Sequence, residues 1–235
     1  MKVATLALGL LVALTGFASG QAPEAGRSTL PPSVTRFLNN HAESLIQFRA
    51  VRHLEATNTR FKKHGWMDVV TELSPDSGFT FHVTAEGGSE YIRRKVLRPI
   101  LEGEQEIVAR GEARRSALTL DNYEMQREEP AETGLVRLFV TPKREERTLI
   151  DGTLLITEGD ADLVRVTGRL AKNPSFWTKR VDIVRTYGRI AGIRVPLSIE
   201  SVAQVRIAGP SAMTMTYRYD MVNGRNVTHE ETTGD

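Results

Sequence analysis

The chain has 235 residues, with 31 lysines and arginines against 29 acidic residues and no cysteine. The missing cysteine excludes a disulfide framework and a cysteine-linked lipid anchor. The nearly balanced charges, interspersed along the chain, argue against a nucleic-acid partner, which normally requires lysine and arginine clustered on one face. A chain of this length buries enough surface to fold as one all-β domain without disulfides.

The first twenty residues predict a secretory signal peptide. Lys2 gives a positive start, an apolar and small-residue run extends from Val3 to Phe17, and Ala18-Ser19-Gly20 forms a small-x-small cleavage site. The apolar run is shorter than the roughly 20 residues that a membrane-spanning helix needs. We therefore expect residues 1–20 to be cleaved, which gives a periplasmic or secreted protein without a transmembrane segment.

The mature chain is expected to form one domain. Residues 21–33, rich in Pro, Ala, Gly and Ser, predict a flexible lead-in. Ser33 is typical of an N-cap, and apolar residues at helical spacing predict an amphipathic helix from Val34 to about Ile46. The domain is expected to span residues 34–225, and the polar residues 226–235 are expected to fray.

Alternating hydrophobicity predicts most of the remaining chain to be strand. Strands are expected at 48–57, 66–73 and 79–84, followed by a second amphipathic helix from Ser89 to Val108 that Pro99 should kink or split. Seven more strands are expected at 123–127, 135–141, 147–157, 162–171, 179–187, 193–207 and 213–221. About ten successive strands cannot remain a flat open sheet. We predict a mainly β (α+β) fold, a curled, unclosed antiparallel β-barrel with two amphipathic helices covering or plugging its concave face.

The residue patterns give little support for catalysis. The five histidines show no metal-ligand spacing, and no serine lies in a G-x-S-x-G elbow. We therefore expect no catalytic residue, no metal and no cofactor. An exported hydrolase acting on cell-envelope material stays open as an alternative, because two carboxylates that meet across a pocket leave no mark in a sequence.

Several aromatic residues are candidate contacts for an apolar ligand. Phe176 and Trp177 lie in a predicted turn, where they either cap the core or form part of a binding lip. Aromatic residues on the strands could line a cavity if the helices do not fill the barrel. These are Trp66, Phe79, Phe81, Phe139 and Tyr187. An empty apolar interior would indicate a carrier, and a filled one a structural or interaction protein.

Two stretches resemble periplasmic lipoprotein carriers. The stretch DGTLLITEGDADLVRVTG, which ends at Gly168, resembles a strand pair of the LolA, LolB and RseB-like superfamily. The stretch VDIVRTYGRIAGIRVP, from Val181 to Pro196, resembles a later hairpin of that superfamily. The resemblance extends over residues 34–223. It implies an unclosed barrel with a hydrophobic cavity for acyl chains, and a pocket arginine at either Arg49 or Arg52.

The sequence thus predicts a soluble, non-catalytic periplasmic protein that binds a lipidic or hydrophobic ligand, such as an acyl chain or a lipoprotein, for transport or sensing. Besides the hydrolase, one other alternative stays open. An envelope-stress or assembly protein could recognise other proteins through an exposed strand edge.

Overall fold

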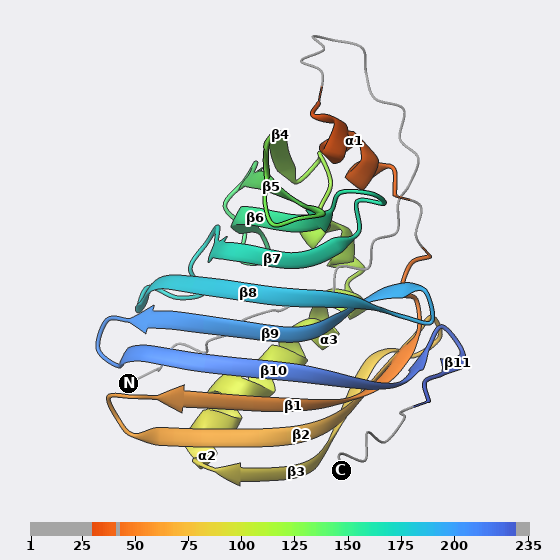
Figure 1. The fold of residues 1–235 in the computed structure, drawn as a ribbon. Coiled ribbons are helices and arrows are strands. Elements are labelled where there is room, and N and C mark those ends of the chain that lie inside the picture. Colours follow the sequence, from red (N-terminus) through yellow and green to blue (C-terminus); the bar gives the residue numbers. More distant parts are fainter. Residues whose placement is uncertain (1–29, 41–42, 229–235) are drawn as a thin grey trace, which may run out of the picture.

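A curled antiparallel sheet makes up most of the computed structural model of the protein, which describes residues 30–40 and 43–228 (Figure 1). The predicted signal peptide, most of the lead-in and the end of the polar tail lie outside the described residues. The strand order is β3-β2-β1-β10-β9-β8-β7-β6-β5-β4, and the short β11 pairs with β10. Because β3 and β4 are the two ends of this order, the barrel is curled but not closed.

The strands are β1 (Phe48–Asn58), β2 (Lys63–Ser74), β3 (Gly78–Gly88), β4 (Tyr123–Pro130), β5 (Leu135–Pro142), β6 (Ile150–Thr157), β7 (Leu163–Leu170), β8 (Thr178–Ile190), β9 (Ile193–Val205), β10 (Gly209–Val222) and β11 (Arg225–Asn226). The ten longer strands confirm the ten strands that the sequence predicts. Strand β1 shows the reason, because every second residue from Phe48 to Asn58 is buried, as a half-buried strand requires.

Helix α1 (Pro32–Leu38) is shorter than the sequence predicts. The predicted helix to Ile46 is wrong, since the chain leaves the helix at Asn39 and runs from Glu43 to β1 without helical structure. The predicted apolar stripe would bury both Leu45 and Ile46. Instead, Leu45 is buried in the core and Ile46 is exposed. The N-cap is Pro31 rather than Ser33, and Pro32 takes the first helical position, where its missing N–H costs nothing.

The second predicted helix is present and changes its winding on the way. It consists of α2 (Glu90–Ile92), a π-helical segment (Arg93–Leu97) and α3 (Arg98–Ala109), followed by a 3₁₀ segment (Glu112–Ser116). Pro99 lies in the first turn of α3, directly after the wider π-helical segment. The wider π-helical turn before Pro99 therefore accommodates the proline within the helical segment. Among the helices of the described residues, none is both long and apolar enough to cross a membrane.

A pair of glycines lets β6 and β7 approach each other closely. Gly152 of β6 pairs with Gly168 of β7, and a Cβ on Gly152 would lie only 2.5 Å from the Cα of Gly168. No other residue fits such a close approach of two strands without a backbone shift. Both positions belong to the stretch that resembles the lipoprotein carriers.

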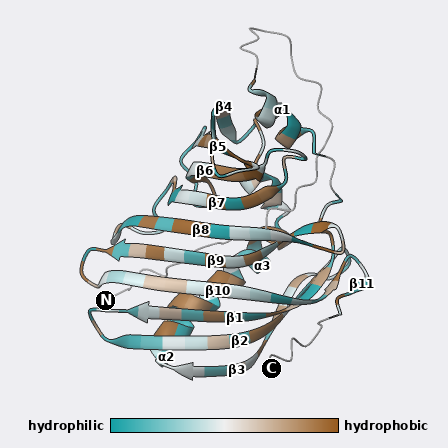
Figure 2. Cartoon of the chain, in the orientation of Figure 1, coloured by the Kyte–Doolittle hydropathy of each residue, from teal (hydrophilic) through white to brown (hydrophobic). Residues whose placement is uncertain are grey.

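The concave face is covered in two different ways. Helix α3 crosses behind β9, β10 and β1 and contacts β3, and its hydrophobic residues lie along this crossing (Figure 2). The shorter α1 packs on β4 and β5 at the other side of the molecule and buries Val34 and Phe37. The two predicted helices therefore do cover the concave face.

Candidate functional site

A buried ion pair joins helix α3 to the concave face of the sheet. Arg52 points inward from β1 with no exposed surface, and its Nη1 and Nη2 donate to Glu104 Oε2 and Oε1 at 2.6 and 3.1 Å. Leaving either charge buried and alone would cost several kcal/mol, roughly 3–5 when one partner is removed. The pair therefore holds the helix in its place on the sheet.

Aromatic rings surround the guanidinium of Arg52. Its central carbon lies 5.5, 5.0 and 4.6 Å from the ring centres of Phe48, Phe79 and Tyr217. Burial alone would lower the pKa of Arg52, but the negative charge of Glu104 outweighs it and raises the pKa above its ordinary value. The interior thus holds a permanent positive charge in an aromatic setting.

Two stacked tyrosines continue this interior on β10. The rings of Tyr217 and Tyr219 are 6.0 Å apart and nearly parallel, and burial raises the pKa of both hydroxyls. Tyr219 Oη donates to the Pro196 carbonyl at 2.9 Å. Tyr217 Oη is buried and has no hydrogen-bond partner among the residues that the structure describes. Arg52 Nε is likewise buried without a hydrogen-bond partner in the described structure, so both atoms are left for a further partner.

The space between the helix and the sheet is mostly filled. Leu97, Ile100 and Leu101 are almost fully buried there. A cavity of about 40 Å³ remains beside them, lined by Ala56, Thr57, Ile92, Val96, Ile100, Ser201, Ala203, Ser211, Ala212 and Met213. Pockets that hold a drug-sized ligand measure roughly 300–1,000 Å³. The helix and the side chains beneath it therefore leave no room for a ligand of that size in this structure.

The sequence-predicted contact residues divide between the two faces of the sheet. Arg52 and Phe79 lie in the interior, and Phe81 and Tyr187 are half-buried against the core. Of the two candidate pocket arginines, Arg49 faces outward and lies 3.4 Å from Glu72. The interior position therefore belongs to Arg52.

The remaining predicted contact residues lie outside the interior. Trp66 is on the outer face of β2, where its ring stacks on His53. Phe139 is on the outer face of β5. Phe176 and Trp177 are 77% and 42% exposed and do not cap the core.

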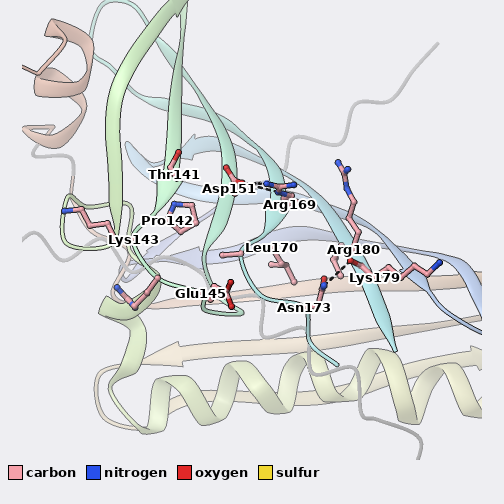
Figure 3. A pocket seen from close by; sticks show the side chains of 13 residues that line it. Thr141, Pro142, Lys143, Glu145, Asp151, Arg169, Leu170, Asn173, Lys179 and Arg180 are labelled. Atoms are coloured by element: carbon pink, nitrogen blue, oxygen red, sulfur yellow. Dashed lines mark hydrogen bonds and ion pairs between the residues drawn. The ribbon is translucent and has the colours of Figure 1, made fainter. Parts of the chain in front are cut away.

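A polar cleft of about 500 Å³ opens at the end of the sheet where β5 and β7 finish and β6 and β8 begin (Figure 3). Leu170 and Val181 are the buried residues of its lining. The charged residues of the lining are Lys143, Arg144, Glu145, Asp151, Arg169, Lys179 and Arg180. A second cleft of about 480 Å³ shares Asp151, Arg169 and Arg180 with it and continues across the outer face to β9. Sequence reasoning missed this site, because its cations come from separate segments.

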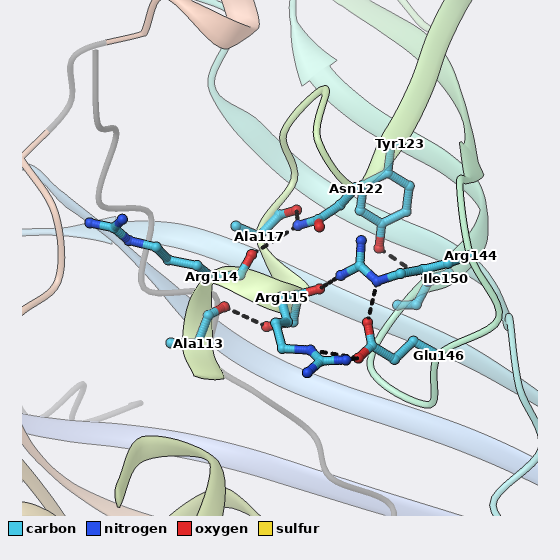
Figure 4. Close-up of polar contacts among 10 residues, drawn as sticks. Ala113, Arg114, Arg115, Ala117, Asn122, Tyr123, Arg144, Glu146 and Ile150 are labelled. Atoms are coloured by element: carbon cyan, nitrogen blue, oxygen red, sulfur yellow. Dashed lines mark hydrogen bonds and ion pairs between the residues drawn. The ribbon is translucent and has the colours of Figure 1, made fainter. Parts of the chain in front are cut away.

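A hydrogen-bonded cluster fixes one wall of this cleft. Arg115 Nε and Arg144 Nε donate to the two oxygens of Glu146 at 2.8 and 2.6 Å, and Arg144 Nη2 donates to the Arg115 carbonyl at 2.8 Å (Figure 4). Nearby, the Ile150 N–H donates to Tyr123 Oη at 3.1 Å. The loop between β5 and β6 is thereby tied to the 3₁₀ segment that follows α3.

Arginines hold a carboxylate in each of the two regions. Glu104 is the buried carboxylate of the described residues, and Arg52 engages both of its oxygens. In the polar cleft, Asp151 is held by Arg169 at 2.6 Å. The described part of the chain contains no group of three or more His, Asp or Glu side chains that could hold a metal ion.

No family model and no curated protein matches the sequence. The fold is similar to the crystal structure of a LolA superfamily protein from Nitrosomonas europaea, with a TM-score of 0.42 and 9% identity over 83% of this chain and 93% of that one. It is also similar to a DUF1329 family protein from Desulfovibrio piger, with a TM-score of 0.37 and 11% identity over 80% of this chain and 90% of that one. The first of these belongs to the superfamily that the sequence resembles. Both TM-scores are low, so the residues of this chain must carry any argument about function.

Proposed function

We propose that this protein binds a lipidic or otherwise apolar ligand between the concave face of the sheet and helix α3, and performs no chemistry on it. The observation that carries the proposal is the way in which the interior is filled. A long helix, held there by the Arg52–Glu104 pair, occupies the concave face. A filled interior alone would equally suit a structural protein, whereas ligand binding requires that this helix can leave the concave face.

The helical cover has the features of a movable element. Its ends are marked by Gly88 and Gly111, which take φ values of +71° and +64°. The five-residue π-helical segment and Pro99 lie within it. π-helical turns are frequent at functional sites, and proline weakens the helical hydrogen-bond ladder. These features favour a helix that can shift as a unit over the sheet.

A ligand could replace the apolar cover and the negative charge that the helix now provides to the concave face. If the helix lifts, the apolar surface that Leu97, Ile100 and Leu101 cover is exposed, and an acyl chain would regain about 25 cal/mol for each Å² that it buries. Arg52 would lose Glu104 and would need another negative partner. A carboxylate or phosphate at the head of the ligand supplies one. The proposed ligand is therefore an amphiphile with an anionic head and an apolar tail.

A fatty-acid probe tests the proposal. Ala203 is 5% exposed and lines the small cavity, so Ala203→Leu reduces the apolar space beneath the helix. Native mass spectrometry of the purified protein should show bound lipid, and a fluorescent fatty acid should bind. Ala203→Leu is expected to weaken this binding about tenfold, because filling a packed site costs about 1–3 kcal/mol.

The neighbouring residue provides the control. Val202 is 42% exposed on the outer face of β9, and Val202→Leu should leave probe binding unchanged. Circular dichroism establishes that both variants are folded. The proposal fails if neither bound lipid nor probe binding is found, or if the two variants affect binding equally.

A further inference from the structure

Three strand connections lie together at one end of the sheet. They are the β1–β2 turn (59–62), the β7–β8 loop (171–177) and the β9–β10 turn (206–208), which we call the loop tips. They gather at this end because β1, β7 and β9 all run toward it and β2, β8 and β10 run back (Figure 1). The opposite end of the sheet carries the β2–β3 and β8–β9 turns.

Hydrogen bonds connect the loop tips into one surface. Arg60 Nη1 donates to the Ile207 carbonyl at 2.6 Å, which ties the first turn to the third. The Arg206 N–H donates to the Trp177 carbonyl at 2.8 Å, and Arg206 Nε donates to the Phe176 carbonyl at 3.1 Å. Backbone atoms accept these bonds, and the Arg206 guanidinium also lies over the Phe176 ring, 5.0 Å from its centre.

Those apolar side chains project into solvent. Phe61, Phe176, Trp177 and Ile207 are 53%, 77%, 42% and 58% exposed. One large apolar residue on a surface needs no explanation, but several on neighbouring loop tips form an apolar patch of the kind that marks an interaction site. Each of the three connections contributes at least one of them. Projecting tips of this kind fit into a soft, deformable surface better than into a preformed pocket.

The loop tips and the strand residues next to them carry a concentrated positive charge. The segments 59–63, 171–180 and 205–210 contain no Asp or Glu. Their cationic residues are Arg60, Lys62, Lys63, Lys172, Lys179, Arg180 and Arg206. Lys62, Lys172 and Lys179 form no ion pair with any described residue. Arg180 pairs with Asp182 at 2.6 Å, and the other six cations still form a strong local excess in a chain of formal net charge +2. The polar cleft adjoins it and shares Lys179 and Arg180.

We propose that the loop tips dock on an anionic membrane surface. Phe61, Phe176, Trp177 and Ile207 enter the interface between headgroups and acyl chains, where aromatic side chains are favoured. The surrounding lysines and arginines face the lipid phosphates. Exposed apolar side chains and cations in the same segments match both requirements of a peripheral membrane protein. This docking does not depend on the ligand-binding function proposed above.

Tryptophan fluorescence reports the docking directly. The chain has two tryptophans, so Trp66→Phe leaves Trp177 as the sole emitter. Vesicles of phosphatidylcholine with a quarter phosphatidylglycerol should shift its emission to the blue, whereas pure phosphatidylcholine should shift it far less. In the wild-type background, co-sedimentation with the anionic vesicles should weaken at least tenfold in Phe176→Ser/Trp177→Ser, because two apolar side chains no longer enter the interface.

Charge variants and a matched apolar variant complete the test. Lys62→Gln and Lys179→Gln should each weaken vesicle binding about fivefold, and added salt should weaken it further. Ile46→Ser removes a comparably exposed side chain (57%) near the opposite end of the sheet and should bind as the wild type does. Circular dichroism shows that each variant is folded.

Other outcomes would overturn the docking proposal. They are no binding to anionic vesicles, equal losses in Ile46→Ser and the tip variants, or tip-dependent binding to an acidic protein without vesicle binding. The cavity variant Ala203→Leu should leave vesicle binding intact. Failure of membrane docking and failure of interior ligand binding are therefore distinguishable.

Discussion

The two parts of the concave face are filled by different means. On β4 to β7, the strands' own aliphatic residues, such as Leu138 and Leu154, fill the core beneath a seven-residue helix. On β1, β9 and β10, a long helix with a π-helical segment provides the filling and brings a buried carboxylate to Arg52. Aliphatic packing favours one arrangement, whereas a charged pair in the interior costs desolvation and makes the structure depend on one contact. Under the proposed function, the first half stays fixed and the second half opens to admit the ligand.

Removing the Glu104 carboxylate, which α3 brings to the part of the concave face formed by β1, β9 and β10, should have the largest effect on stability. Glu104→Ala leaves Arg52 charged and buried without its partner, so the free energy of unfolding should fall by about 3–5 kcal/mol. Urea denaturation measures this. If the helix also loosens, the fatty-acid probe should bind more tightly than to the wild type.

Two variants sharpen the test of Glu104. Glu102 is on the same helix but exposed, and Glu102→Ala should change stability by less than about 0.5 kcal/mol. The double variant Arg52→Met/Glu104→Leu replaces the pair by apolar side chains and should recover most of the stability. Equal losses in Glu102→Ala and Glu104→Ala would contradict a role for the buried pair.

A cavity in the first half should destabilise the protein without opening it. Leu154 has no exposed surface, and Leu154→Ala should lower the free energy of unfolding by about 2–4 kcal/mol. Its neighbour Leu155 is less buried, so Leu155→Ala should cost less. Probe binding to folded Leu154→Ala should match that of the wild type. An increase as large as in Glu104→Ala would show that the two halves are not distinct.

The smallest effect is expected at alkaline pH, from the interior tyrosines. Burial raises the pKa of Tyr217 above its ordinary value of 10.0. Below that pH both folded and unfolded chains keep the proton, so stability does not depend on this group. Above it the unfolded chain loses protons that the folded chain retains, and the free energy of unfolding must fall as the pH rises.

The variant Tyr217→Phe isolates this contribution. It removes a buried hydroxyl without a described partner, so stability at neutral pH should stay equal or rise by about 1 kcal/mol. Urea midpoints measured from about pH 9 to about pH 11 should fall less steeply than in the wild type. An unchanged slope would place the ionisation elsewhere, and a large loss at neutral pH would mean that the hydroxyl has an interior partner.

The sequence by itself determined the strands, the second helix and the curled sheet. Alternation of apolar side chains is a local property, and β1 and β10 follow it almost residue by residue. The helical spacing of apolar residues was a less reliable guide at the first helix, which ends at Asn39 although apolar residues continue along the chain. Two predictions, the signal peptide and the fraying tail, concern residues for the most part outside the described structure and stay predictions.

Only the tertiary structure decided which side chains meet. Arg52 and Glu104 are 52 positions apart, and nothing near either residue marks the other as its partner. Trp66 turned outward because a strand alternates its faces and its neighbour Met67 took the interior. The sequence likewise could not show which charges lie near one another in space. The chain has mixed charges along its length, yet strand directions bring Lys62, Lys179 and Arg206 to one end of the sheet, because antiparallel strands place distant turns side by side.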